Sequence, residues 1–347
     1  MKFKLDLAPA IEKINAMKAK RVMLQLPEGL KHHALEYVPE LEEQTHAVVF
    51  LSADPCFGAC DLADHKAKAL GCELLVHVGH SQMYEPALPT IFLLGTWVFD
   101  PAPLLEKTLE LMKQQGIKST SIATTAQYKE YLPKIHEFLQ KNGIESVIGE
   151  PTERTSFEGQ VLGCSFGSVL KTVKGVESIL YFGDGLFHPL GMALSFKKPV
   201  VFADTISMAA RMIDKEKEAY LKKRWVAISM ARNSERFGVI VALKEGQFRP
   251  QLAEQLKKKI EDSGKKAMIV QLDHASPSVL GGMLGKKGNE FEVLVFTSCP
   301  RIPIDDQEGY PIPVLTAPEL EMALRKDDLG NYYFDQMNQA RYAKIGH

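Results

Sequence analysis

The sequence predicts an α/β protein made of three similar domains, each a four-stranded parallel sheet with flanking helices. The first observation behind this prediction is that short apolar runs alternate with helical patterns along all 347 residues. Such runs are typical of strands buried on both faces of a parallel sheet. The second observation is that one segment, which joins a cysteine, a helix, a glycine and a strand, recurs along the chain. Recurrence of this kind is typical of a duplicated fold.

The first third of the chain shows strand and helix signals in alternation. Helical spacing of apolar residues covers 32–43 and 62–70. Strands are predicted at 21–26, 46–51, 73–78 and 90–94.

The middle and last thirds repeat this alternation. In the middle third, strands are predicted at 121–124, 146–148, 178–182 and 199–202, with helices at 128–142 and 166–174. In the last third, strands are predicted at 238–242, 267–272, 292–296 and 313–315, with a helix at 251–262. Three copies of a four-stranded parallel α/β unit follow from this order.

Two long helices mark the expected domain boundaries. Asp100 precedes a helical pattern at 104–115, and Asp204 precedes one at 208–223. Aspartate or serine before such a pattern is typical of a helix N-cap, so we expect rigid junctions rather than flexible linkers. The predicted domains are 1–100, 101–207 and 208–347. The stretch 325–347 has no clear periodicity and is left unassigned.

The repeated segment places cysteines at matching positions. The number of residues from Cys60 to Gly79 equals the number from Cys164 to Gly183, and both segments pass from a predicted helix start to the end of a strand. A third, looser copy ends at Cys299, at the end of its second strand. If the three units pack around a pseudo-threefold axis with these edges inward, the three cysteines can meet.

The composition is that of an ordinary soluble protein. Apolar residues make up 45% and charged residues 24%, and the net charge is −1. No global basic field marks a nucleic-acid or membrane binder. No apolar stretch reaches about 18 residues, and acidic residues interrupt the N-terminus, so we expect no membrane span, no signal peptide and a cytoplasmic location. Five cysteines in such a chain are more naturally thiols or metal ligands than disulfides.

Polar residues gather at the predicted carboxyl ends of the strands, where ligands bind in open parallel sheets. Arg301 follows Cys299 closely and could hold a carboxylate with its guanidinium, or could instead pair with Asp305 or Asp306. The other candidates for contacts to a cofactor or substrate are Gln25, His80, Asp184, His188, Gln271 and His274.

Three thiolates without a fourth equivalent ligand suit a 4Fe-4S cluster that keeps one iron open. A structural zinc site would require a fourth ligand and usually contains close Cys-x-x-Cys pairs, which this chain lacks. Cys56 is close enough in sequence to Cys60 to be a rival ligand, whereas Cys72 is predicted to be a core residue.

Several well-known motifs are missing from the sequence. There is no Walker motif and no G-x-G-x-x-G after a first strand. The C-x-x-x-C-x-x-C signature of the large radical S-adenosylmethionine superfamily is also absent, because Cys60 is followed by Asp-Leu-Ala.

Five segments together resemble the diphthamide biosynthesis family, and within it the archaeal 2-(3-amino-3-carboxypropyl)histidine synthases. They are QLPEGL at 25–30, GACDLAD at 58–64, VGHS at 78–81, GDGLFH at 183–188 and SCPRIPIDD at 298–306. The resemblance implies three α/β domains, a homodimer and a 4Fe-4S cluster held by Cys60, Cys164 and Cys299. It also implies transfer of the 3-amino-3-carboxypropyl group of S-adenosylmethionine to C2 of a histidine in translation elongation factor 2, with an external electron donor and release of methylthioadenosine.

Two alternatives to this function stay open from the sequence alone. Quinolinate synthase also has three α/β domains around a three-cysteine 4Fe-4S cluster, but it acts on small carboxylic acids, and its motifs match less well. A non-enzymatic scaffold with a structural zinc is the third possibility.

Overall fold

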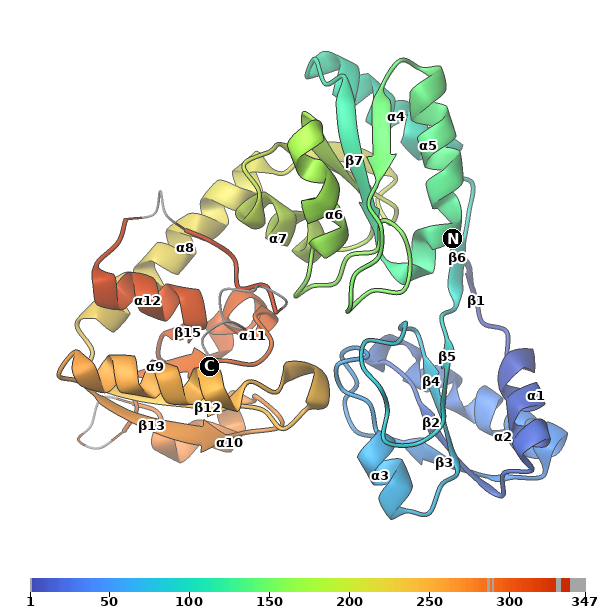
Figure 1. Cartoon of the computed structure of the whole chain (residues 1–347), viewed down its shortest axis with the longest axis horizontal. Helices are drawn as coiled ribbons and strands as arrows, with labels where there is room; N and C mark the ends of the chain where they lie inside the picture. The colour runs from blue at the N-terminus through green and yellow to red at the C-terminus, as the bar shows by residue number, and fades with distance from the viewer. Residues whose placement is uncertain (1, 286–287, 289, 329–331, 338–347) are drawn as a thin grey trace.

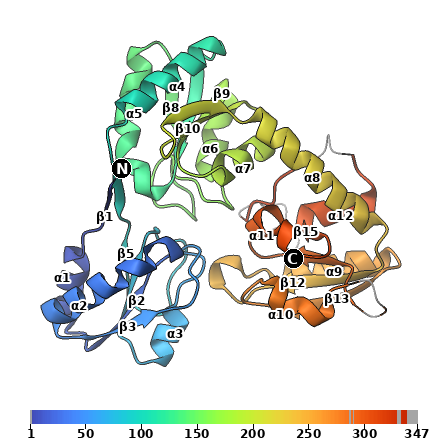
Figure 2. The ribbon, with the colours of Figure 1, turned by 180° about the vertical axis from the view of Figure 1, so that it is seen from behind.

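The chain folds into three lobes, each built on a parallel sheet, which confirms the predicted α/β class (Figure 1). The structure is a computed structural model that describes residues 2–285, 288, 290–328 and 332–337. In the two opposite views, the loops after the strands of the three sheets face the region between the lobes (Figures 1 and 2). The domain limits 1–100, 101–207 and 208–347 and the pseudo-threefold axis stay predictions.

The first sheet has the strand order β3-β2-β4-β5, with every pair parallel. Its strands are β2 (Arg21–Gln25), β3 (Val48–Ser52), β4 (Leu74–Val78) and β5 (Thr90–Leu93), as the sequence predicted. The helices of this part are α1 (Ala8–Met17), α2 (Ala34–Thr45) and α3 (Asp64–Ala69). A small antiparallel ribbon of β1 (Lys2–Lys4) and β6 (Thr96–Val98) lies at the junction with the middle lobe.

The middle sheet has five strands in the order β11-β10-β9-β7-β8, one more than predicted. The four predicted strands form as parallel β7 (Ser119–Thr124), β8 (Glu145–Ile148), β9 (Ser178–Gly183) and β10 (Val200–Asp204). The added strand β11 (Ala209–Met212) runs antiparallel to β10. The helices are α4 (Ala102–Gln114), α5 (Leu132–Lys141), α6 (Gly167–Thr172) and α7 (Phe187–Ser195).

The helix predicted at 208–223 is wrong in its first part. The helix there, α8 (Asp214–Arg232), begins only after β11. Asp204 does not cap a helix, because its carboxylate accepts hydrogen bonds from the Ile206 amide and the Ser207 hydroxyl and so turns the chain back along β10. Arg211 completes the hairpin by lying over the Phe202 ring and pairing with Asp204.

The third sheet is fully parallel, with the order β13-β12-β14-β15. Its strands are β12 (Arg236–Val241), β13 (Lys266–Gln271), β14 (Val293–Phe296) and β15 (Val314–Thr316), again as predicted. The helices are α9 (Pro250–Asp262), α10 (Pro277–Leu280), α11 (Arg301–Asp305) and α12 (Ala317–Arg325). Within the described residues, no helix is long and apolar enough to cross a bilayer.

A buried ion pair joins α8, which leads from the middle lobe, to α12 of the third. Arg224 donates two hydrogen bonds of 2.7 Å to the Glu319 carboxylate, and both side chains are at most 2% exposed. Arg224 also donates to the carbonyls of Pro303 and Val314, so one carboxylate and two carbonyls stabilise its buried charge. The hydrogen bond to Pro303, a residue of α11, holds that helix against α8.

The C-terminal segment that the sequence left unassigned returns to the middle lobe. Asp335 pairs with Arg249, and the Gln336 side chain accepts a hydrogen bond from the Phe166 amide. The Met337 amide donates to the carbonyl of Cys164 at 2.8 Å. Residues 332–337 therefore help to position Cys164.

Candidate metal centre

Cys60, Cys164 and Cys299 each lie in a loop that faces the other lobes. Cys299 follows the end of β14 after Thr297 and Ser298, close to the strand end, as predicted. Cys60 and Cys164 do not begin helices, because α3 starts only at Asp64 and α6 only at Gly167. All three cysteines are free and keep some solvent access, which a site that admits a substrate requires.

The three thiols form one electrostatically coupled group. Burial raises the pKa of Cys60 to about 11, and the nearby Cys164 raises it further. Burial also raises the pKa of Cys299, with further contributions from both Cys60 and Cys164. Cys164 therefore disfavours the ionisation of Cys60, and both disfavour the ionisation of Cys299, so a bound cationic group would relieve that repulsion. The donor set fits a cluster ligated at three corners by thiolates.

A loop of the third lobe closes over Cys60. The side-chain amide of Gln247 donates a hydrogen bond of 3.2 Å to the Cys60 sulfur, and Lys244 pairs with Asp61 at 2.5 Å. A Cβ atom at Gly246 would lie 2.5 Å from the Cys60 Cα atom, so only glycine fits this approach. This loop was not predicted from the sequence, because its contact with Cys60 joins distant segments of the chain.

Arg154 connects all three lobes beside Cys164. Its guanidinium donates to the Gly246 carbonyl at 2.8 Å and reaches the Met83 sulfur at 3.0 Å. Burial raises the pKa of Cys164, and the charge and hydrogen bond of Arg154 oppose that rise. The Arg154 Nε atom is buried, and no hydrogen-bond partner for it is found among the described residues. Arg154 was not predicted as a site residue, because nothing in its sequence neighbourhood distinguishes it.

Gln25 holds the loop that carries Cys60. Its amide nitrogen donates to the Asp61 carbonyl at 2.8 Å, and its oxygen accepts from the Ala63 amide at 3.0 Å. The same oxygen lies 2.9 Å from Nδ1 of His77, a buried residue on β4. The structure thus shows Gln25, predicted as a cofactor contact, bonded to protein groups beside the cysteine.

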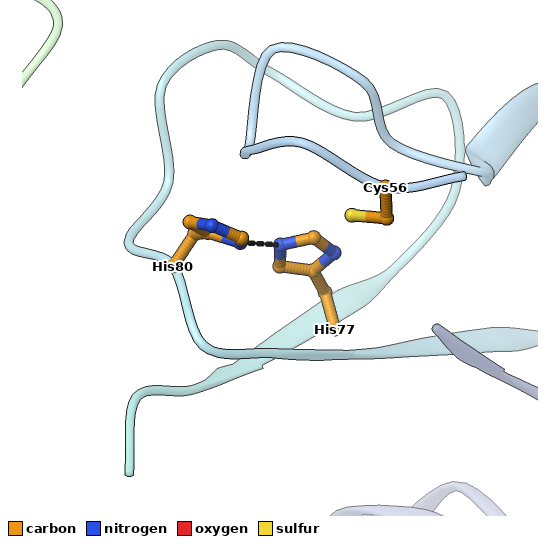
Figure 3. A group of neighbouring side chains, drawn as sticks. All are labelled: Cys56, His77 and His80. Carbon is orange, nitrogen blue, oxygen red and sulfur yellow. Dashed lines mark hydrogen bonds between the residues drawn. The ribbon is translucent and has the colours of Figure 1, made fainter. Parts of the chain in front are cut away.

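His77 and His80 form a hydrogen-bonded pair of neutral imidazoles (Figure 3). Burial lowers the pKa of His77 well below its usual value and lowers the pKa of His80 to about 4. Because Gln25 offers only an oxygen to His77 Nδ1, we assign the proton to that nitrogen. His77 Nε2 then accepts the hydrogen bond from Nδ1 of His80, across 3.1 Å.

Asp184 and His188 lie at the matching edge of the middle sheet. The Asp184 carboxylate accepts a hydrogen bond of 3.1 Å from the Tyr128 hydroxyl, and burial raises the pKa of Asp184. His188 stacks on the Tyr181 ring. Burial, followed by the charge of Arg301, lowers the pKa of His188 to about 3.

Arg301 is braced within its own helix. It pairs with Asp305 at 2.7 Å, one of the two partners that the sequence allowed, and its guanidinium lies 4.2 Å from the centre of the Phe187 ring. The Arg301 backbone amide also donates to the Cys299 thiol, which lowers the pKa of that thiol. Arg301 therefore lies between the middle and third lobes, next to a candidate ligand.

Gln271 and His274 lie on the exposed end of edge strand β13 and its loop. The Gln271 amide donates to Asp273 at 3.0 Å, and His274 acts electrostatically on Asp54 of the first lobe. Among the predicted polar residues, Gln25 and Arg301 interact with the loops that carry cysteines, and His188 lies close to Arg301. Gln271 and His274 instead interact with Asp273 and Asp54.

The two remaining cysteines differ from each other. Cys72 is buried in an apolar cluster with Met23, Ala67 and Leu75, which confirms it as a core residue. Cys56 is also buried, which raises its pKa to about 12, but it lies beside His77 and His80 rather than in an apolar cluster.

The comparisons with known proteins agree with this architecture. A family model of diphthamide synthesis proteins matches residues 26–334. The 2-(3-amino-3-carboxypropyl)histidine synthase of Pyrococcus horikoshii is 38% identical over 328 residues, which cover 94% of this chain and 92% of the relative. The synthase of Methanocaldococcus jannaschii is 28% identical over 345 residues, covering 95% and 91%.

A solved structure shows the same fold. The crystal structure of Dph2 from Pyrococcus horikoshii with a 4Fe-4S cluster aligns with a TM-score of 0.88 at 35% sequence identity, covering 97% of this chain and 95% of that one. Since the family model spans most of the sequence and a relative above 30% identity aligns along nearly all of it, the chain belongs to the family of diphthamide synthesis proteins.

Proposed function

We propose that the chain is a transferase of the first step of diphthamide biosynthesis, a 2-(3-amino-3-carboxypropyl)histidine synthase like the relatives named above. It would transfer the 3-amino-3-carboxypropyl group of S-adenosylmethionine to C2 of a histidine in translation elongation factor 2. When one electron enters the sulfonium, the bond from sulfur to the methionine γ-carbon breaks and methylthioadenosine leaves. A carbon-carbon bond then forms at C2, and the C2 proton and one electron leave, so the overall transfer consumes no electron. The observation that carries the proposal is the coupled group of three thiols.

Cys60, Cys164 and Cys299 are the proposed ligands of a 4Fe-4S cluster. When bound, the cluster would supply the electron for cleavage of the sulfonium bond, and these three cysteines would leave one of its irons free of protein ligands. An external donor must first deliver that electron.

The protein provides a hydrogen-bond donor for each proposed ligand. Gln247 donates a hydrogen bond to Cys60, Arg154 donates one to Cys164, and the backbone amide of Arg301 donates one to Cys299. Hydrogen bonds to cluster sulfurs tune the reduction potential, because they stabilise the more negative, reduced state. Since two of the three donors are side chains, the chain can set this potential through its own residues.

The substrate contacts proposed from the sequence remain Arg301, Gln271, His274, Gln25, Asp184, His188 and His80. Arg301 has the strongest support among them, because its guanidinium is half-exposed beside Cys299 and matches a carboxylate geometrically. Gln25 has less support, because its amide atoms already bind the loop of Cys60. We keep the homodimer, the protein substrate elongation factor 2 and the cytoplasmic location as parts of the same proposal.

Anaerobic reconstitution with iron and sulfide tests the proposal. The expected result is a brown protein that, after reduction with dithionite, converts S-adenosylmethionine to methylthioadenosine. Colourless protein that retains zinc would favour the structural scaffold. Brown protein that leaves S-adenosylmethionine intact would contradict the proposed reaction and would favour a reaction like that of quinolinate synthase.

A further inference from the structure

Cys56, His77 and His80 form a second group of metal-binding side chains, distinct from the three cysteines proposed to hold the cluster. The Cys56 sulfur and one ring nitrogen of each histidine all lie within 4.8 Å of one another. In Figure 3, the sulfur points toward the pair of imidazole rings. Cys56 and His77 are buried and His80 is partly buried, so the group is neither an exposed cluster nor an apolar core.

The spacing of the two histidines is already close to that of two zinc ligands. Their facing nitrogens are 3.1 Å apart. Two nitrogens bound to one tetrahedral zinc ion lie about 3.3 Å apart, given zinc-nitrogen bonds of about 2.0–2.1 Å. A metal ion could therefore replace the proton between the rings with little movement of the backbone.

Gln25 presents His77 in the orientation that a metal ligand needs. Its oxygen lies 2.9 Å from His77 Nδ1, which leaves the lone pair of Nε2 facing Nδ1 of His80. Metal-bound histidines commonly donate their second N–H group to an oxygen in this way, which fixes the tautomer. The Gln25 side chain is itself held by Asp61 and Ala63, so the arrangement is rigid.

We propose that Cys56, His77 and His80 bind one zinc ion, with the fourth position open to water. One thiolate and two imidazoles are ligands that zinc favours, and both histidines are neutral in the fold. Such an ion ties the loop before Cys60 to the carboxyl end of β4. A bound zinc ion would therefore restrain the loop that carries Cys60, one of the proposed cluster ligands.

Without a metal ion, the same residues would form only a packed polar network. The Cys56 thiol then has a weak contact of 3.9 Å with the Gly58 carbonyl, and the histidines keep their mutual hydrogen bond. A zinc site and a metal-free network predict different results when zinc is supplied: only the zinc site binds the metal, and only there does removal of Cys56 weaken binding.

The test uses the full chain with Cys60→Ser, Cys164→Ser and Cys299→Ser, which removes the other thiol group so that bound metal reports on this site. After exposure to zinc and desalting, we expect about one zinc ion per chain, and after exposure to cobalt an absorption band from charge transfer between thiolate and cobalt. Adding Cys56→Ser or His80→Gln should weaken zinc binding at least tenfold, whereas adding Cys72→Ser should leave it unchanged. Circular dichroism verifies that each variant is folded. If Cys56→Ser or His80→Gln does not fold, the other variant still tests the site.

Three results would overturn the proposal. They are absence of zinc from the folded triple variant, zinc binding that survives both Cys56→Ser and His80→Gln, and cobalt binding without a thiolate band. Activity plays no part in these readouts, so failure of the zinc site and failure of the proposed reaction are distinguishable.

Discussion

The side-chain amide of Gln247 donates a hydrogen bond to the Cys60 sulfur across 3.2 Å, although the two residues belong to different thirds of the chain. The contact depends on Gly246, where a side chain would collide with the Cys60 backbone. A loop of the third lobe thus sets the electrostatic surroundings of a thiol in the first.

Gln247→Leu should lower the reduction potential of the reconstituted cluster, because it removes a donor that stabilises the reduced state. We expect a decrease on the order of tens of millivolts, where about 59 mV corresponds to a tenfold change for one electron. A redox titration followed by electron paramagnetic resonance measures it. Gln114→Leu, on the exposed face of α4, is the matched control, and an equal potential in both variants would refute the role of Gln247.

Arg224→Met should strongly destabilise the protein, because it leaves the Glu319 carboxylate buried without its partner. The expected loss in the free energy of unfolding is about 3–5 kcal/mol. Urea denaturation of the metal-free protein measures this loss. The control is Lys223→Met, on the same helix as Arg224, which removes an exposed ion pair with Glu308. It should change the free energy of unfolding by less than about 1 kcal/mol. Similar losses in the two variants would contradict the account.

Lowering the pH should destabilise the protein in part through His188. Burial holds the pKa of His188 at about 3 in the fold, below the ordinary value of 6.5, so the unfolded chain binds the extra proton between these values. The stabilising contribution is complete above pH 6.5 and is lost as the pH falls toward 3.

His188→Gln should reduce this pH dependence. Between pH 7 and pH 4.5, the natural chain should lose about 2 kcal/mol more stability than the variant. Urea denaturation at both pH values tests this, with His65→Gln at an exposed position as the control. Parallel stability losses in the natural chain and in His188→Gln would show that His188 does not contribute.

Arg301→Lys should retain the cluster but bind S-adenosylmethionine roughly tenfold more weakly, because lysine keeps the charge and loses the planar fork. Equilibrium binding and the yield of methylthioadenosine measure the effect. Asp305→Asn removes the brace and leaves the guanidinium in place. If Arg301 only braces the loop, affinity for S-adenosylmethionine would be unchanged in Arg301→Lys, and the two variants would share only a loss of stability.

The positions of the parallel strands could be predicted from the sequence, and the three cysteines could be singled out as candidate ligands, because both rest on local signals. Each buried strand is a short apolar run, and Cys60 and Cys164 recur at one repeat position. The hairpin of β10 and β11 was missed because Asp204 precedes an apparent helical pattern, and only the structure shows its carboxylate closing a turn.

The surroundings of the cysteines could not be predicted, because they arise from contacts between distant segments. Gln247 reaches Cys60, and Arg154 reaches both Cys164 and Gly246. Asp335, in a stretch without periodicity, pairs with Arg249 and so brings the C-terminal segment to the site. Nothing in the local pattern of these residues distinguishes them from ordinary surface residues.

The iron and sulfide content of anaerobically reconstituted cysteine variants tests the central claim most directly. The account predicts that the natural chain, Cys56→Ala and Cys72→Ala each hold about four irons per chain. It predicts that Cys60→Ala, Cys164→Ala and Cys299→Ala each lose the cluster or form no methylthioadenosine. A Cys60→Ala variant that keeps a full, active cluster while Cys56→Ala loses it would contradict the account, because the ligand from the first lobe would then be Cys56.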